Sequence, residues 1–225
     1  MSIENAFWSA CNKGDLYIVQ YLMENYKDIV VPIILIPNEY EETIFYILCY
    51  RGYFKIIKYL IDNYRDIILP SICIPNRYRE TSFCRLCYHG NLEIIQYLIE
   101  NCGDIILPII SIPDKYGYTP FYWLCYKGNY KIIKYLVENC KDALFNTLSI
   151  RNIHKLTPFY ILCYNGNLKI IQYLVEKCED ILVPTISMPD NFGRTPLHVL
   201  CDNGHLDIIT YLLNSNIINE SNIDI

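Results

Sequence analysis

The chain has 225 residues, and its 19 Lys and Arg residues against 24 Asp and Glu residues give a formal net charge of −5. This charge argues against a nucleic-acid-binding protein, because nonspecific affinity for nucleic acid comes from Lys and Arg side chains that neutralise phosphates. The 52% of hydrophobic residues can fill a large core, which excludes disorder for most of the chain.

The apolar runs are too short for a membrane span, which needs about 20 residues. The longest covers residues 29–37 and contains two prolines. The N-terminus has no basic stretch before an apolar one, so no signal peptide is predicted. We therefore expect an intracellular protein, cytoplasmic or nuclear, that contacts no membrane and keeps its 11 cysteines as reduced thiols.

An internal repeat with a constant step of 38 residues runs through the chain. The glycines of this step are Gly14, Gly52, Gly90, Gly128, Gly166 and Gly204. The cysteines are Cys11, Cys49, Cys87, Cys125, Cys163 and Cys201, and we call them the cysteine ladder. We predict one domain of six stacked units, with the boundaries 1–37, 38–75, 76–113, 114–151, 152–189 and 190–225.

The last unit shows the elements that each repeat is expected to form. Thr195 is a predicted helix N-cap followed by Pro196 at the first helical position. A short helix over 197–203 ends at Gly204, where a left-handed backbone is expected. A second helix is predicted over 206–214, because its apolar residues recur at helical spacing. Such a pair cannot bury its apolar face alone and must stack on the next pair.

These motifs resemble the ankyrin repeat. The segment from Asp190 to His198 is similar to the family's finger loop and helix start, and residues 204–209 are similar to the start of its second helix. The resemblance implies an all-α solenoid of six helix-turn-helix repeats with projecting fingers. It also implies a non-catalytic scaffold that binds a partner protein in a concave groove. The Ile-, Asn- and Tyr-rich composition looks like that of ankyrin proteins from giant DNA viruses of amoebae, which would place the chain in the host cytoplasm.

The repeat departs from the family pattern in three ways. The family period is about 33 residues, so five are extra, between the second helix and the next finger. The helix-ending glycine there is replaced by Tyr26, Tyr64, Cys102, Cys140 and Cys178. The motif histidine survives as His198 and is otherwise Tyr46, Cys84, Tyr122 or Tyr160, which puts its hydrogen bonding in doubt.

The inserted segments carry an Ile/Leu/Val run, a proline and then a strand-like Ile-x-Ile-Pro pattern. The copies cover 29–37, 67–75, 105–113 and 181–189, while 143–151 lacks both prolines. They either pack side by side as an extra layer or leave an apolar ridge for a partner.

No residue set indicates catalysis or a cofactor. We expect the cysteine ladder to fill small buried slots as free thiols. Cys84 and Cys87 form a lone Cys-x-x-Cys, so a metal or redox site there is a minor alternative, since zinc sites generally need four ligands. The chain is predicted to be no enzyme and to bind neither a metal nor a cofactor.

The partner surface is predicted at positions that vary between repeats. These are the finger tips and the two residues before each helix-ending glycine. Their aromatic members are Tyr40, Tyr78, Tyr116 and Phe192 on the fingers, and Tyr50, Tyr88, Tyr126 and Tyr164 on the first helices. Tyrosine is enriched in interface hot spots, although these rings could instead pack on each other between repeats.

The charge of the fingers changes along the chain. The first finger is acidic through Glu39, Glu41 and Glu42, whereas the later ones carry Arg77, Arg79, Lys115, Lys155 and Arg194. A partner protein with one basic end and a longer acidic stretch would fit. We expect a monomer that binds this unknown protein partner. A second hypothesis is a substrate adaptor for a ubiquitin ligase, acting with a separate F-box-type subunit.

Overall fold

The computed structural model describes residues 2–144 and 147–218. Within these ranges the chain forms thirteen α-helices and two short 3-10 helices, and no strand. No helix of this described part has the length and apolar character needed to cross a membrane. The all-helical architecture predicted from the repeat is confirmed.

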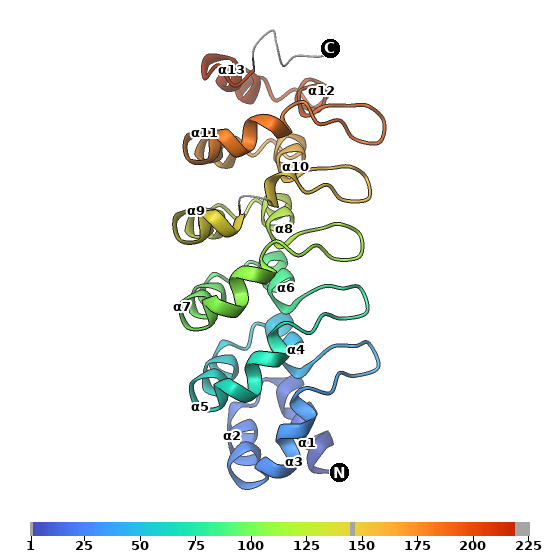
Figure 1. Ribbon diagram of the computed structural model, residues 1–225, viewed down its shortest axis with the longest axis vertical. Helices are drawn as coiled ribbons and strands as arrows, with labels where there is room; N and C mark the ends of the chain where they lie inside the picture. Colours follow the sequence, from blue (N-terminus) through green and yellow to red (C-terminus); the bar gives the residue numbers. More distant parts are fainter. Residues whose placement is uncertain (1, 145–146, 219–225) are drawn as a thin grey trace. The chain divides into compact units, whose positions relative to one another are not determined.

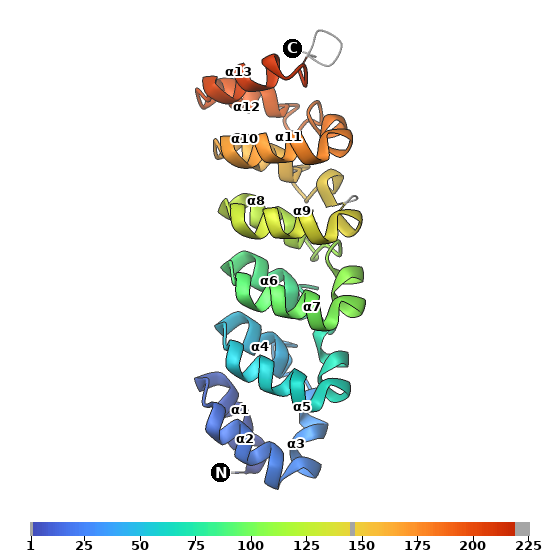
Figure 2. The ribbon, with the colours of Figure 1, turned by 90° about the vertical axis from the view of Figure 1, so that its left-hand side faces the viewer.

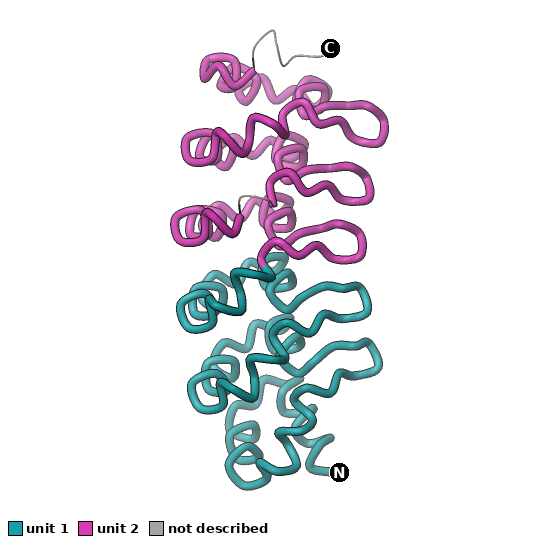
Figure 3. The backbone as a smooth tube through the Cα atoms, viewed as in Figure 1, with its two compact units in different colours: residues 1–109 teal, residues 110–225 magenta. Residues whose placement is uncertain are grey.

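The fold divides into two compact units, residues 1–109 and 110–225 (Figure 3). Unit 1 contains α1 (Ile3–Lys13), α2 (Leu16–Asn25), α3 (Lys27–Ile34), α4 (Ile44–Arg51), α5 (Phe54–Ile72), α6 (Ser82–His89) and α7 (Leu92–Ile109). Unit 2 contains α8 (Pro120–Lys127), α9 (Tyr130–Leu144), η1 (Thr147–Ser149), α10 (Pro158–Tyr164), α11 (Leu168–Leu182), η2 (Val183–Thr185), α12 (Pro196–Asp202) and α13 (Leu206–Asn214). The boundary falls inside the predicted repeat 76–113, and the single-domain assignment stays a prediction.

Each first helix is bounded by the residues that the repeat keeps constant. The Thr43 hydroxyl accepts a hydrogen bond from the Tyr46 backbone N–H at 3.1 Å, and Thr81, Thr119 and Thr157 cap their helices in the same way. At the other end, Gly52 and its equivalents have φ between 68° and 76°, a conformation that only glycine adopts without strain. The predicted starts and ends of these helices are therefore confirmed.

The fingers are built on one acceptor side chain at the base of each loop. Asp190 Oδ1 accepts from the backbone N–H groups of Phe192 and Arg194, at 2.8 and 2.9 Å. Asn38, Asn76, Asp114 and Asn152 do the same for their own fingers. In Figure 1 the fingers project from the first helices of each unit on the side away from the second helices. The same turn therefore forms at the base of all five fingers.

The strand-like pattern predicted for the inserted segments is wrong, because their apolar runs are helical and the Ile-x-Ile-Pro parts, such as residues 110–113, form turns and irregular chain. The second helices continue after one residue with non-helical torsion angles, Tyr64, Cys102, Cys140 or Cys178, whose φ lies between −139° and −135°. In the first repeat Tyr26 has φ −134° and separates α2 from α3. A negative φ is open to any residue, so the chain bends and resumes a helix at once, where a left-handed glycine would have ended it.

These third helical segments pack as an added layer and also leave apolar side chains outside. In unit 1, α3 packs against α1 and α5, and it buries Val30 and Ile34 completely. Leu35 and Ile36 remain exposed. We call the exposed apolar side chains of the inserted segments the third-segment ridge. Further members of this ridge are Leu107, Ile112 and Val183. Both hypotheses for the inserts thus describe part of the structure.

Five members of the cysteine ladder are buried free thiols, as predicted. Burial raises the pKa of Cys11 to about 12 and the pKa values of the next four well above 9.0. The prediction is wrong for Cys201, which is exposed. Cys201 lies on α12, after which no further first helix follows among the described residues, so the neighbour that covers the other ladder positions is missing.

Candidate functional site

The predicted partner-binding aromatics lie on one kind of surface in each unit, which we call the finger face. It consists of the finger tips and the carboxyl ends of the first helices. Seven of the eight predicted rings are exposed, from Tyr116 at 39% to Phe192 at 83%. Tyr88 is half-buried instead, and its ring contacts His89 at 5.2 Å between centroids. The structure therefore places the predicted residues where a partner could reach most of them.

In unit 1 the exposed tyrosine rings are covered in part by arginines of the same chain. The Arg77 guanidinium lies 5.0 Å from the centre of the Tyr40 ring, on the neighbouring finger. Arg85 lies 5.5 Å from the Tyr50 ring and 5.6 Å from the Tyr88 ring. Contacts of this kind hold both partners in place. The finger face of unit 1 is therefore aromatic and cationic at the same points.

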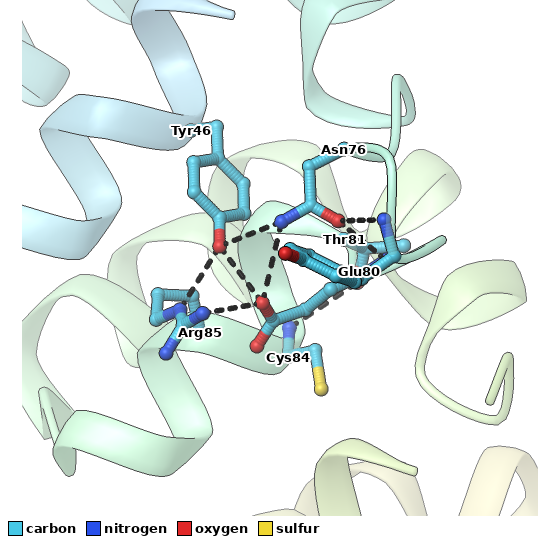
Figure 4. Close-up of polar contacts among 7 residues, drawn as sticks. Tyr46, Asn76, Glu80, Thr81, Cys84 and Arg85 are labelled. Carbon is cyan, nitrogen blue, oxygen red and sulfur yellow. Dashed lines mark hydrogen bonds and ion pairs between the residues drawn. The ribbon is translucent and has the colours of Figure 1, made fainter. Parts of the chain in front are cut away.

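Behind these rings lies a buried polar network (Figure 4). The Tyr46 hydroxyl donates to Glu80 Oε2 at 2.8 Å, and it accepts from Asn76 Nδ2 at 3.1 Å and from Arg85 Nε at 3.0 Å. Arg85 also forms an ion pair with Glu80 at 2.5 Å. Burial and the Glu80 charge raise the pKa of Tyr46, so it stays a neutral donor. The network joins α4 to the finger and first helix of the next repeat.

A hollow of about 430 Å³ opens beside this network, between α1, the first finger and α4. It is lined by Asn12, Asn38, Tyr40, Glu42, Tyr46, Ile47, Tyr50 and Arg51. Asn38 Nδ2 donates to Glu42 at 3.1 Å within it. The lining combines three tyrosines with charges of both signs, which suits a polar side chain of a partner protein.

Unit 2 repeats the aromatic and cationic arrangement. The Trp123 ring meets the Tyr126 ring edge-on at 5.7 Å, and Lys127 lies 5.6 Å from Tyr126. On the last finger Arg194 lies 5.6 Å from the Phe192 ring. A hollow of about 490 Å³ lies between the ends of α8 and α10 and is lined by Tyr126, Lys127, Gly128, Tyr164, Asn165 and Asn167.

The last finger is fixed by a buried carboxylate at its base. The Tyr160 hydroxyl donates to Asp190 Oδ2 at 2.8 Å, and Arg194 donates to the same oxygen from two nitrogens. Burial opposes ionisation of Asp190, but the Arg194 backbone N–H, the Tyr160 hydroxyl and the other donors outweigh it and lower the pKa to about 2. Asp190 is therefore a charged anchor near neutral pH, and it is not free to act as a base.

The sequence reasoning missed Arg85 and Trp123, which support the exposed rings. Both lie at one repeat position, five residues before the helix-ending glycine, where the other repeats carry Ser9, Ile47, Ile161 and Val199. That position varies as much as the finger tips do. Each of the two side chains lies one helical turn before a predicted tyrosine. Comparing the repeats at that position as well would have identified both residues as candidates for the finger face.

The alternative metal or redox site at Cys84 and Cys87 is closed to solvent. Cys84 and Cys87 are both buried, and burial raises the pKa of Cys87 well above 9.0. Within residues 2–144 and 147–218, no group of three or more His, Cys, Asp or Glu side chains is placed to hold a metal ion.

A third hollow, of about 480 Å³, lies away from the fingers, on the helical segments that follow the bends of α5 and α7. It is lined by Asp66, Leu69, Pro70, Cys73, Ile105, Pro108 and Ile109. Its lining is almost wholly apolar, and Cys73 is an exposed thiol there. This hollow is the main alternative to the finger face as a contact surface.

Comparisons with known proteins agree with this architecture. A family model described as ankyrin repeats in many copies matches residues 7–61 and 83–137, and one described as three copies matches residues 138–224. A crystal structure of the ankyrin repeat protein EF0377 is similar in fold, with a TM-score of 0.75 and 20% identity over 95% of this chain and 98% of that one. The search of curated proteins finds no match. Since the family matches cover most of the sequence, the chain belongs to the ankyrin repeat family.

Proposed function

We propose that this protein is a non-catalytic scaffold that binds a partner protein through its finger face. Ankyrin repeat proteins are typically interaction scaffolds and generally have no catalytic activity of their own. The observation that carries the proposal is the exposure of large aromatic side chains that recur at equivalent positions of successive repeats, on the fingers and at the ends of the first helices. Aromatic side chains supply contact area at low entropic cost and dominate interface energetics.

The charges beside the rings favour an acidic partner segment over most of the finger face. Lys115, Lys127 and Arg194 each lie against a predicted aromatic residue of unit 2. In unit 1 the acidic side chains of Glu39 and Glu41 are exposed on the first finger and favour a basic residue of the partner. Complementary charges mainly speed association and are screened by salt. Binding should therefore weaken as the ionic strength rises.

The test replaces Tyr78, Tyr88, Tyr116 and Tyr126 together by Ala. Proteins from the native cell are first captured on the unaltered chain and identified, and the partner is then purified and titrated against both chains. Central interface aromatics cost about 2 kcal/mol or more each on truncation, so the affinity should fall at least 100-fold. A thermal melt of each chain controls for loss of fold.

The matched control replaces Ile36, Leu107 and Ile112 on the third-segment ridge by Ala. These side chains are also exposed and apolar, but they do not belong to the finger face. If the control variant loses the partner while the tyrosine variant keeps it, the ridge is the interface and the proposal is wrong. If the tyrosine variant melts far lower, its rings pack between repeats, and single exposed-tip variants such as Phe192→Ala must carry the test.

The finer assignments stay predictions, each with its own test. An adaptor role for a ubiquitin ligase would use the same finger face, and it predicts that an F-box-type subunit copurifies with the chain. A viral origin and a place in the host cytoplasm, or in the nucleus, are predictions that imaging of the expressed protein in an amoebal cell would check. Metal analysis of the purified protein tests the minor hypothesis at Cys84 and Cys87.

A further inference from the structure

The first repeat exposes side chains whose equivalents in later repeats are buried or half-buried. Ile18 on α2 is 40% exposed, whereas its equivalents Ile56, Ile94, Ile170 and Ile208 are exposed by 2% or less. Tyr21 is 49% exposed, whereas Tyr97 and Tyr173 are 9% and 8% exposed and the other equivalents, Tyr59, Tyr135 and Tyr211, are half-buried. The later residues lie against the preceding repeat of their own unit. Ile18 and Tyr21 form, in the first repeat, the half of a repeat interface that faces a preceding repeat.

The residue beside them also departs from the repeat. Tyr17 is 76% exposed, and every equivalent position carries a charge: Lys55, Glu93, Lys131, Lys169 and Asp207. The end of a solenoid is expected to be polar, because it must stay soluble without a neighbour. Here an aromatic residue replaces the usual charge at the most exposed point. We call Tyr17, Ile18 and Tyr21 the α2 face.

The last described helix exposes the other half of the same interface. Leu213 on α13 is 48% exposed, while its equivalents Met23, Ile61, Val137 and Val175 are exposed by 6% or less and Ile99 is half-buried. Leu206 is 70% exposed, and its equivalents Phe54, Tyr130 and Leu168 are half-buried. We call Leu206 and Leu213 the α13 end. Within unit 2, α13 packs on α11, and the two helices lie next to each other in Figure 2.

Contacts inside each unit show how these two halves fit together. The Tyr97 ring packs edge-on against Phe54 of the preceding repeat at 5.6 Å, and the Tyr173 ring packs in the same way against Tyr130 at 5.7 Å. In repeat terms, Tyr21 is equivalent to Tyr97 and Tyr173, and Leu206 is equivalent to Phe54 and Tyr130. A second copy placed as the next repeat would therefore set Tyr21 against Leu206.

We propose that copies of this chain associate head to tail, with the α2 face of one copy on the α13 end of another. The contact continues the established repeat interface, using the same positions and the same kinds of side chain. It is independent of the finger face, and it is an alternative to the monomer expected from the sequence, which stays a prediction. Because the two surfaces differ, each added copy leaves one of each free, so assembly should grow with concentration.

The test blocks each surface separately and then mixes the two variants. One variant is Tyr17→Lys with Ile18→Lys, and the other is Leu206→Lys with Leu213→Glu. Sedimentation velocity of the unaltered chain should show its mean mass rising above that of one chain with increasing concentration. Each variant alone should stay monomeric. Their mixture should form a one-to-one dimer, because each still carries the surface that the other lacks.

Controls separate this contact from partner binding and from unfolding. Phe192→Lys changes the finger face, so it should lower partner binding and leave self-association unchanged. Circular dichroism checks that each variant is folded, and Tyr17→Lys alone, which introduces the residue found in three other repeats, serves if the double variant unfolds.

Three results would overturn the proposal. The unaltered chain could stay monomeric up to its solubility limit. The α13 variant could still dimerise, which would mean that two α2 faces pair with each other. The mixed variants could fail to form a complex.

Discussion

Replacing Tyr46 by Phe tests whether the buried network behind the finger face holds neighbouring repeats together. The change removes only the hydroxyl from a ring that is 1% exposed. It deletes the hydrogen bond to the Glu80 carboxylate, and a bond to a charged group contributes about 1.5–3 kcal/mol. It also deletes the bonds from Asn76 and Arg85, although both keep a contact with Glu80 Oε2. The free energy of unfolding should therefore fall by about 2–4 kcal/mol.

The chain supplies its own comparison at the equivalent position of the fifth repeat. Tyr160→Phe also removes a bond to a buried carboxylate, but Asp190 keeps two guanidinium bonds and two backbone N–H donors. Tyr160→Phe should therefore lower the free energy of unfolding by less, about 1–2 kcal/mol. Tyr50→Phe, on an exposed ring, should change the stability by less than about 0.5 kcal/mol.

Denaturant unfolding followed by circular dichroism measures the three variants side by side. The predicted order of loss is Tyr46→Phe, then Tyr160→Phe, then Tyr50→Phe. Hydrogen exchange should also show faster opening of the finger at residues 76–80 in the Tyr46 variant, because its anchor is lost. If Tyr46→Phe is no more harmful than Tyr50→Phe, the network contributes nothing to stability and the reasoning is refuted.

Three further outcomes follow from particular side chains. Native-state thiol labelling should modify Cys73 and Cys201 quickly and the five buried ladder cysteines slowly; equal rates would contradict the burial. Asp190 has a folded pKa of about 2, below its ordinary 3.8, so its stabilisation is present above pH 4 and is lost as the pH falls through about 2. Melts from pH 7 to pH 2 should therefore fall less steeply for Asp190→Asn. Gly166→Ala should cost more than about 1 kcal/mol, since φ is +68° and a Cβ would lie 2.4 Å from His205, whereas Gly103→Ala meets nothing within 4 Å and should be neutral or stabilising.

The helix starts, helix ends and finger turns could be predicted because each depends on residues that are close together in the sequence. Thr195, Pro196 and Gly204 act within one or two turns of the chain, so their chemistry can be read without knowing the fold. The inserted segments could not be read in this way. Their Ile-x-Ile-Pro pattern is typical of a strand, but the apolar run before it is helical and the pattern itself, for example at residues 110–113, forms a turn and irregular chain. The decisive residue was the one before the insert, where a glycine would have ended the helix.

The candidate site was predictable only for large side chains that recur at positions expected to face solvent. The exposed tips, such as Tyr40 and Phe192, were found because an aromatic residue returns at the same finger position in four of the five fingers. The exposed state of Cys201 could not be found from the pattern, since an end repeat has the same residue and a different neighbour. The exposure of Ile18 and Leu213 could not be predicted for the same reason, because each lies in a repeat with a different set of neighbours. A repeat sequence describes the average environment of a position, and the ends depart from that average.

The replacement of the motif histidine by tyrosine has a consequence for the finger face as a whole. In the last repeat the Thr195 backbone N–H donates to His198 Nδ1 at 3.2 Å, so the histidine stabilises its own helix start. The longer Tyr46 and Tyr160 side chains instead reach the base of the following finger. The hydrogen bond is thus moved from within a repeat to between repeats. Each such bond fixes a finger relative to the helix beside it, which lowers the entropy that a partner must remove on binding. A rigid finger face of this kind favours a partner whose bound segment is itself well ordered.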